Sequence, residues 1–324
     1  MSNLLVFALY FLGHGQSGNS LNAQLSDDAI IFPNDEDLFQ SVTSTSAQPS
    51  GKLIEIFPDN CGIQSYKFQN ERRIKRAPNL IQIMVVGGTD ARVGVHPWIA
   101  RIGQNGRFFC GGALITAKHV VTAAHCLGKR GEYMVRLGDH DKDDDSDPGR
   151  IDVVVKAMIP HEKYLKAKQL VQNDIAILLL KESVKFTDRI SPICLPMAGL
   201  RNLDLANRSV TVAGWGALSY GGEKAKVLQQ ANLIVTPHNE CIQSYKSIKL
   251  LINNDQICAN NPGKDACGGD SGGPLTFFYP ESRRHYLVGI VSFGYKCADE
   301  RFPGVYARTT SYMNWITEKV MNMN

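Results

Sequence analysis

Short apolar segments separated by turn residues fill the chain from residue 85 onward, and this pattern constrains the fold more than any other feature. Residues 209–216, 229–237 and 285–294 are segments of this kind, rich in β-branched and aromatic side chains. Apolar runs of this length, bounded by glycine, proline and polar residues, are typical of β-strands. The sequence therefore predicts an all-β barrel or sandwich.

Two of the expected strands should differ in burial. Ile151, Val153 and Val155 are spaced two apart, which is typical of a strand with one buried face. Residues 175–180 read IAILLL and are apolar throughout. We expect this second strand to be buried on both faces.

Only residues 309–320 show a helical pattern. The apolar side chains that share one face of this helix are Met313, Ile316 and Val320. Thr310 or Ser311 is a suitable residue to cap its N-terminus. One C-terminal helix is therefore expected beside the β-structure.

Composition limits the class of protein. The chain has 324 residues, of which 44% are hydrophobic and 20% charged, enough for one large core or two moderate ones. Its net charge is +4, from 35 basic and 31 acidic residues. This excess is too small and too dispersed to indicate a nucleic-acid partner.

The first 84 residues differ in character from the rest. The apolar run at residues 4–12 is well short of the roughly 20 residues that cross a bilayer, so no membrane association is expected. Residues 1–17 resemble a secretory signal peptide, although no Lys or Arg precedes the apolar run. Residues 18–84, rich in Ser, Thr, Asp and Pro in their first part, are predicted to form a largely flexible pro-segment. These features predict a secreted, extracellular protein.

The chain contains eight cysteines, an even number behind the predicted signal peptide. Such a set favours disulfides. Zinc is the alternative, but no CxxC pair occurs. Sequence alone does not choose among the pairings.

Ser271 lies in the sequence GDSGGP, where glycines on both sides allow a sharp turn and close approach of another molecule. GDSGG also matches the nucleophile elbow of α/β-hydrolases, but that fold needs an acid and then a histidine downstream. After Ser271 the only histidine is His285, and the only aspartate, Asp299, follows it. Upstream, His125 and Asp174 give the order His, Asp, Ser, and an imidazole held by a carboxylate is what activates a serine hydroxyl.

Several segments together resemble the signature segments of a trypsin-like, chymotrypsin-fold serine protease. They read CGGALITAKHVVTAAHC, NDIAILLL, AGWG, GDSGGP, VSFG and PGVYARTT, and the likeness spans residues 85–324, the expected protease domain. The resemblance implies two six-stranded antiparallel β-barrels with the active site between them and a C-terminal helix. In that site His125 would be the general base, Asp174 its orienting acid and Ser271 the nucleophile. The backbone amides of Gly269 and Ser271 would form the oxyanion hole.

The resemblance also implies disulfides. It pairs Cys110 with Cys126, Cys241 with Cys258, and Cys267 with Cys297. The remaining Cys61 and Cys194 would then tether the pro-segment after cleavage, as in relatives that retain a pro-chain. We therefore expect a two-chain active form.

A set of residues matches the substrate pocket of the family: Asp265, Ala266, Ser292, Phe293, Gly294 and Gly304. Asp265 would lie at the bottom of the pocket, where a buried carboxylate selects a cationic side chain. The resemblance thus implies cleavage after Arg or Lys. Ala266 stands where many relatives have serine, which removes a partner for a lysine ammonium, so we expect a preference for Arg.

Activation in the family exposes a new N-terminus that pairs with the acid before the nucleophile, here Val85 with Asp270. The residue before Val85 is Met84, where an activating trypsin-like enzyme would need Arg or Lys. Three explanations remain open: an enzyme with apolar specificity cuts after Met84, trimming follows a cut in the basic sequence ERRIKR, or the chain carries an unusual insertion.

Six aspartates lie between Asp139 and Asp147, in a loop where some relatives hold calcium. We favour a solvated loop and treat Asp139 and Asp147 as weak calcium candidates; no cofactor is otherwise expected. Asn207 begins the one glycosylation sequon, NRS.

The sequence as a whole predicts a secreted zymogen of a serine endopeptidase acting by limited proteolysis in a cascade, with some likeness to arthropod proteases. The partners implied are protein substrates with Arg or Lys at the cleavage site, an activating protease and serpin-type inhibitors. The alternative is a catalytically silent homologue that serves as a binding partner or cofactor. Such homologues commonly lose a residue of the triad, and this chain retains all three.

Overall fold

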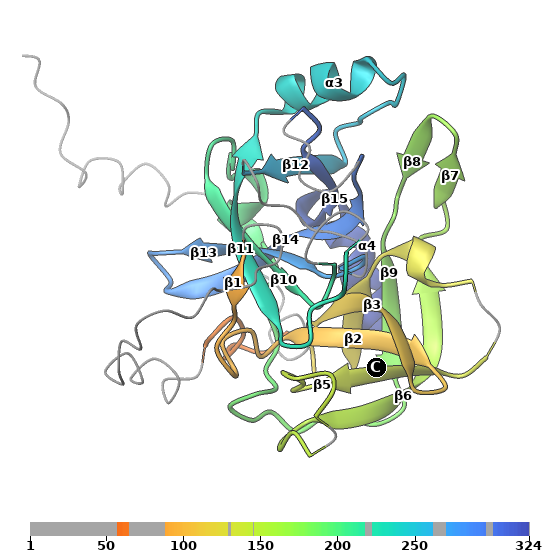
Figure 1. The fold of residues 1–324 in the computed structure, drawn as a ribbon, viewed down its shortest axis with the longest axis vertical. Coiled ribbons are helices and arrows are strands. Elements are labelled where there is room, and N and C mark those ends of the chain that lie inside the picture. Colours follow the sequence, from red (N-terminus) through yellow and green to blue (C-terminus); the bar gives the residue numbers. More distant parts are fainter. Residues whose placement is uncertain are drawn as a thin grey trace, which may run out of the picture. The chain divides into compact units, whose positions relative to one another are not determined.

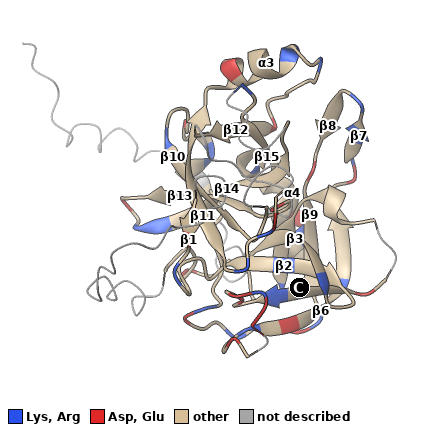
Figure 2. Cartoon of the chain, viewed as in Figure 1, with Lys and Arg blue, Asp and Glu red and all other residues tan. Residues whose placement is uncertain are grey.

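The computed structural model describes residues 57–64, 88–128, 131–144, 146–217, 222–261, 270–295 and 301–323 (Figure 1). The predicted signal peptide, most of the predicted pro-segment and the pair Met84 and Val85 lie outside these ranges. No helix in the described ranges is long and apolar enough to span a membrane. Figure 2 shows Lys and Arg positions on strands and loops throughout the β-structure, in keeping with the dispersed charge of the sequence.

The first barrel is a closed antiparallel ring in which each strand bonds to two neighbours. In ring order its strands are β2 (Ile99–Gln104), β3 (Arg107–Leu114), β4 (His119–Thr122), β9 (Ala176–Leu180), β6 (Ile151–Pro160) and β5 (Tyr133–Leu137). A small hairpin of β7 (Leu165–Ala167) and β8 (Leu170–Gln172) precedes β9.

The second barrel is also a ring of six antiparallel strands, closed by the pairing of β11 with β12. In ring order they are β10 (Ser209–Gly214), β11 (Gln229–Thr236), β12 (Gln256–Asn260), β15 (Gly304–Arg308), β14 (Arg284–Phe293) and β13 (Pro274–Tyr279). A short strand, β1 (Thr89–Asp90), pairs antiparallel with the first two residues of β11. The predicted fold class of two six-stranded barrels is therefore confirmed.

The burial of β6 and β9 follows the two patterns in the sequence. All five residues of β9 are buried, and Ile177 lies opposite Val121 on β4 and Ile159 on β6. Residues of β6 alternate between half-buried and exposed along much of the strand, with Val153 packed against the core. Both burial predictions are confirmed, because apolar side chains leave water wherever a neighbouring layer covers them.

The C-terminal helix α4 (Met313–Asn322) buries Met313, Ile316 and Val320, as predicted. The predicted cap is wrong. Thr310 and Ser311 belong to a 3₁₀ turn, η4 (Thr309–Tyr312), so the residue before α4 is Tyr312, which provides no side-chain cap.

The expectation of a single helix is also wrong, because residues His238–Lys246 form a second helix, α3. Only Cys241 and Tyr245, one turn apart, are buried on it. Cys241 is bonded to Cys258 on β12, and the Tyr245 hydroxyl donates to the Pro303 carbonyl at 2.7 Å. Tertiary contacts therefore hold a helix whose sequence has little amphipathic pattern.

Three of the implied disulfides are confirmed. They are Cys61–Cys194, Cys110–Cys126 and Cys241–Cys258, whereas Cys267 and Cys297 lie outside the described residues. The first bond fixes residues 57–64 to Cys194, which lies in the chain between β9 and β10. Gly62 donates its backbone N–H to Pro192 and accepts one from His285, so this segment is also hydrogen-bonded to the strand it meets.

Candidate active site

His125 and Asp174 come from two loops of the first barrel. His125 lies in a 3₁₀ turn, η2 (Ala124–Cys126), directly after β4, and Asp174 lies between β8 and β9. The Asp174 carboxylate accepts two hydrogen bonds from His125, from the backbone N at 2.9 Å and from Nδ1 at 2.8 Å. Because an ionised carboxylate only accepts, the proton resides on Nδ1 and the lone pair of Nε2 is left for another group.

A third hydrogen bond reaches Asp174 from the second barrel. The Ser292 hydroxyl, near the end of β14, donates to Oδ2 of Asp174, the same oxygen that accepts from the imidazole. Burial alone would raise the pKa of Asp174, but the hydrogen bonds from His125 and Ser292 outweigh it and hold that pKa below the ordinary value. Asp174 is therefore an anion at neutral pH although it is only 3% exposed.

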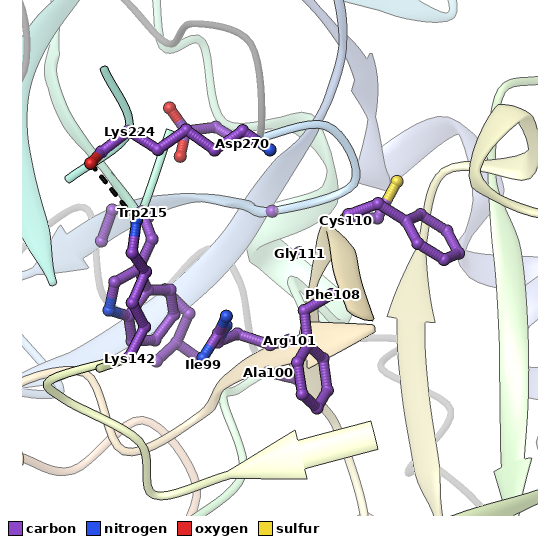
Figure 3. A pocket seen from close by; sticks show the side chains of 14 residues that line it. Ile99, Ala100, Arg101, Phe108, Cys110, Gly111, Lys142, Trp215, Lys224 and Asp270 are labelled. Atoms are coloured by element: carbon purple, nitrogen blue, oxygen red, sulfur yellow. Dashed lines mark hydrogen bonds between the residues drawn. The ribbon is translucent and has the colours of Figure 1, made fainter. Parts of the chain in front are cut away.

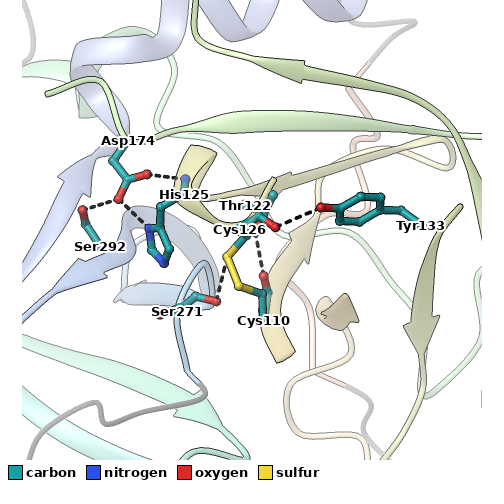
Figure 4. Close-up of a disulfide and its surroundings, with 9 residues drawn as sticks. Cys110, Thr122, His125, Cys126, Tyr133, Asp174, Ser271 and Ser292 are labelled. Carbon is teal, nitrogen blue, oxygen red and sulfur yellow. Dashed lines mark hydrogen bonds and ion pairs between the residues drawn. A yellow bond between two sulfur atoms is a disulfide. The ribbon is translucent and has the colours of Figure 1, made fainter. Parts of the chain in front are cut away.

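Sequence reasoning assigned Ser292 to the substrate pocket and missed this bond to Asp174. No local pattern reveals it, since the two residues are 118 positions apart. Figure 4 shows Asp174 joined to His125 and Ser292, with Ser271 below the imidazole, on the side away from Asp174.

Ser271 lies in the turn that precedes β13 of the second barrel, so the candidate site draws on loops of both barrels. Gly111 donates its backbone N–H to the Ser271 carbonyl at 2.7 Å, which ties this turn to β3 of the first barrel. The following residue, Gly272, has φ +79°, and a Cβ there would collide with Thr122 and Gly111. Only glycine fits this close approach of the two barrels.

The disulfide Cys110–Cys126 lies beside both Ser271 and His125. Cys126 Sγ is 3.6 Å from the Ser271 carbonyl oxygen, and an imidazole nitrogen lies within 4.8 Å of both cysteine sulfurs. Among the described residues these three side chains form the one grouping with metal-ligand geometry. Both sulfurs are in a disulfide, so neither is a thiolate that binds a metal.

Asp270 is buried directly before Ser271, 5% exposed. Its Oδ1 accepts the backbone N–H of Gly216 at 2.7 Å, and a Cβ on Gly214 or Gly216 would collide with the carboxylate. A small cavity of about 40 Å³ adjoins it. Figure 3 shows Asp270 on one side of this cavity and Arg101 with Phe108 on the other.

The substrate-pocket residues are described only in part. Gly304 begins β15 and is buried, Phe293 ends β14, and Gly294 follows it in an exposed position. Asp265, Ala266 and the oxyanion-hole candidate Gly269 lie outside the described residues.

The acidic loop differs from the expected solvated loop only at its two ends, since Asp143 and Asp144 between them are exposed. The side chain of Asp139 is 1% exposed, with Oδ2 bonded to Arg101 and Oδ1 4.0 Å from Arg150. Asp147 pairs with Arg189 at 2.7 Å and accepts the backbone N–H of His140. Arginine cations thus already face both weak calcium candidates.

The predicted glycosylation site at Asn207 lies in an exposed turn with φ +62°, a conformation that asparagine tolerates. Its backbone N–H donates to Val235. The side chain is therefore accessible to modification.

Comparison with known proteins identifies the family. The Trypsin family matches residues 85–316. The proclotting enzyme of Tachypleus tridentatus is 40% identical over 296 residues, covering 86% of this chain and 74% of that protein. The clotting factor G beta subunit of the same species is 39% identical, covering 77% of this chain and 83% of that protein. A venom protease of Bombus pensylvanicus is 37% identical, covering 71% of this chain and 96% of that protein. The two closed barrels and the hydrogen bond between His125 and Asp174 agree with these matches. The chain therefore belongs to the trypsin family of serine proteases.

Proposed function

We propose that this serine protease is the zymogen of a secreted endopeptidase that cleaves protein substrates after arginine, in a cascade of limited proteolysis. The observation that carries the catalytic part is the double hydrogen bond between His125 and Asp174, with Ser271 on the neighbouring turn. Specificity, activation and pathway are supported by the sequence, by the burial of Asp270 and by the names of the relatives.

The chemistry begins at the Ser271 hydroxyl. Its oxygen attacks the substrate carbonyl carbon while Nε2 of His125 takes the proton, and Asp174 stabilises the imidazolium that forms. The C–N bond then breaks as His125 returns the proton to the leaving amine, which leaves an acyl ester on Ser271. Water, deprotonated by the same nitrogen, attacks this ester, releases the acid and regenerates the serine.

Specificity for arginine follows from Asp265 and its neighbour Ala266. A buried carboxylate is costly without a partner, so it favours a substrate whose guanidinium pairs with it in two parallel hydrogen bonds. A lysine ammonium would need a further acceptor, and the alanine side chain has none. Gly294 and Gly304 carry no side chain to narrow the pocket.

Activation would follow cleavage before Val85, whose new ammonium pairs with Asp270. A buried ion pair of this kind is worth several kcal/mol when both charges leave water together, and removing either partner is costly. Support for this role comes from the burial of Asp270 beside Ser271. Met84 points to an activating protease with apolar specificity or to trimming after a basic cut.

The cascade assignment is supported by relatives and by the tether. Relatives covering most of this chain include a proclotting enzyme and a Spaetzle-processing enzyme, names that refer to clotting and to the processing of Spaetzle. The bond Cys61–Cys194 would keep the pro-chain attached after activation. A retained pro-chain suits a regulatory protease better than a digestive one. Secretion, which the disulfides also favour, would expose the enzyme to serpin-type inhibitors.

One experiment tests specificity and activation together. The active species is isolated, its N-terminus is sequenced, and matched Arg, Lys and Phe peptide amides are assayed with Ser271→Ala as the control. We expect an N-terminus at Val85 and the highest kcat/KM for Arg. Equal rates on Arg and Lys substrates would contradict the role of Ala266, and a fully active species with another N-terminus would contradict the role of Val85.

A further inference from the structure

A cavity of about 410 Å³ lies on the second barrel and contains none of the catalytic residues. Its walls come from η3 (Ala198–Asn202) and the residues after it, the first residue of α3, and residues on β12, β14 and β15. Elements separated by more than 100 residues therefore converge on it. A cavity of this size accommodates a small ligand or a few side chains of a partner.

Part of the cavity wall is apolar. Leu205, Ile257 and Val288 line it, each less than 10% exposed and part of the core of the second barrel. Such a surface gains free energy when an apolar group covers it. This wall favours a ligand with an aliphatic or aromatic part.

Arg308 adds a positive charge that forms no ion pair in the described part of the chain, although Asp204 and Asp255 lie near enough to act on it through their charges. Its guanidinium donates to the Gln256 carbonyl from Nε at 3.3 Å and from Nη2 at 3.0 Å, and no carboxylate among the described residues lies within 4.0 Å of it. Burial lowers the pKa of Arg308, although the charges of Asp204 and Asp255 oppose this effect. A half-buried guanidinium whose side-chain hydrogen bonds go to a neutral carbonyl gains a charge-assisted hydrogen bond from an incoming carboxylate.

Two further groups add donors to the same cavity. Arg201 donates from Nη2 to the amide oxygen of Asn314, again a neutral partner. Both ring nitrogens of His238 are shielded from water without a hydrogen-bond partner in good geometry. Burial and, less strongly, the charge of Arg308 lower the pKa of His238, whereas a poorly aligned contact with the Asn254 side chain raises it; the net pKa is lowered, so the ring is neutral at pH 7.

His238 is also the first residue of α3, and Pro237 before it provides no side-chain cap. The positive end of the helix dipole therefore reinforces the two arginines. Asp204, which lines the cavity as well, has one carboxylate oxygen bonded to the backbone N–H of Ala206. The cavity accordingly combines two cations and one anion with an apolar wall.

We propose that this cavity is an exosite for an acidic peptide of a partner or substrate protein, in which a carboxylate side chain binds Arg308 and Arg201. A neighbouring apolar side chain of that peptide packs against Leu205, Ile257 and Val288. The apolar wall and Asp204 together disfavour a densely sulfated sugar, which offers many negative charges and little apolar surface. A peptide with one or two acids beside an apolar residue fits both features.

The test measures binding by fluorescence anisotropy with a labelled tetrapeptide amide of sequence Glu-Leu-Asp-Phe. The protein is the full chain carrying Ser271→Ala, so the result does not depend on proteolysis. A neutral peptide of sequence Gln-Leu-Asn-Phe and a sulfated oligosaccharide are measured alongside. We expect the acidic peptide to bind at least about tenfold more tightly than the neutral one, the effect of a charge-assisted hydrogen bond.

Variants locate the site. Arg201→Gln and Arg308→Gln should each weaken the acidic peptide about tenfold or more, whereas Arg107→Gln, an exposed arginine on the first barrel with the same charge change, should not. Because Arg308→Gln also loses its bonds to Gln256, hydrogen exchange on the protein with Arg201 and Arg308 intact provides a second readout. Bound peptide should slow exchange at residues 203–205 and in the first turn of α3.

Equal binding of the acidic and neutral peptides would overturn the proposal. So would loss of affinity in Arg107→Gln as large as in the two cavity variants, or unchanged exchange at the cavity. Binding of the sulfated oligosaccharide at Arg201 and Arg308 without binding of the acidic peptide would show that the site takes a different class of ligand.

Discussion

At the scale of single residues, burial and hydrogen bonding act in opposite directions on Asp174, and hydrogen bonding prevails. The pKa of Asp174 in the folded protein is lower than the ordinary value of 3.8. Ionised Asp174 therefore stabilises the fold above that value, and the stabilisation is lost as the pH falls from it towards the folded-state pKa. This sets the sign of two tests on Ser292, which donates to the same carboxylate.

Ser292→Ala removes one of the bonds that lower this pKa. We expect kcat/KM of the activated enzyme to fall about tenfold, because one hydrogen bond to a charged group is lost.

The drop in unfolding free energy of Ser292→Ala between about pH 5 and pH 3 should also become smaller than in the wild type. Urea unfolding at a series of pH values measures it. Ser282→Ala, which removes a hydroxyl bonded to the Tyr279 carbonyl, is the control. If Ser292→Ala and Ser282→Ala showed the same dependence of unfolding free energy on pH, the hydrogen bond from Ser292 to Asp174 would not lower the pKa of Asp174.

Gly272 tests the close approach of the two barrels. Gly272→Ala should lower the unfolding free energy by about 2 kcal/mol or more, from a positive φ and from collisions with Thr122 and Gly111. Gly106→Ala has a similar φ of +75° but open space around its Cβ, so it should cost less. Equal losses in the two variants, measured by urea unfolding, would show that the barrels do not restrict the turn.

At the scale of elements, the sequence predicted what depends on local pattern. The strands, the apolar β9 and the buried face of α4 follow from periodicity. Helix α3 could not be predicted, because its stability comes from a disulfide to β12 and a bond to Pro303, neither visible in nine residues of sequence. The cap of α4 failed for a related reason, since the residues expected to provide it form a 3₁₀ turn.

Helix α4 gives a direct test of burial. Ile316 is fully buried on its inner face, so Ile316→Ala should lower the unfolding free energy by about 2–4 kcal/mol. Met321, 41% exposed on the same helix, is the matched position, and Met321→Ala should change it by less than about 0.5 kcal/mol. Similar losses at both positions would mean that α4 does not pack as described.

The loop after β5 shows how distant residues alter a local expectation. Six aspartates predict solvation or calcium, yet Asp139 pairs with Arg101, which is 38 positions away. Asp139→Asn should cost about 3 kcal/mol, because it leaves a largely buried arginine without its partner. Asp143→Asn, at an exposed pair with Lys226, should cost less than about 0.5 kcal/mol.

Calcium dependence of the same loop is tested separately. We expect chelation with EDTA to leave the Tm of the protein unchanged, because arginine cations already neutralise Asp139 and Asp147. A rise in Tm on adding calcium that is absent in Asp139→Asn would contradict this expectation.

At the scale of the whole molecule, the bond Cys61–Cys194 decides whether the activated protease is one unit or two. After cleavage before Val85, we expect a single band on a non-reducing gel and two bands on a reducing gel. In the double variant Cys61→Ser and Cys194→Ser, two bands should appear without reductant. Release of the pro-chain from the activated wild type without reductant would contradict the tether.

The candidate site itself was predicted from chain order and motifs, but its geometry depends on the whole fold. Two loops of the first barrel bring His125 to Asp174, and the second barrel supplies Ser271 and Ser292. The central claim is that His125 and Asp174 activate the hydroxyl of Ser271 and of no other serine. That claim can be tested without knowing the natural substrate.

The most direct measurement is covalent labelling with a phosphonylating reagent for active-site serines, followed by mass spectrometry. An enteropeptidase site placed directly before Val85 gives a defined activated species. We predict a single phosphonyl group on Ser271, and none in Ser271→Ala or His125→Ala. Labelling of another serine, or equal labelling in His125→Ala, would contradict the account.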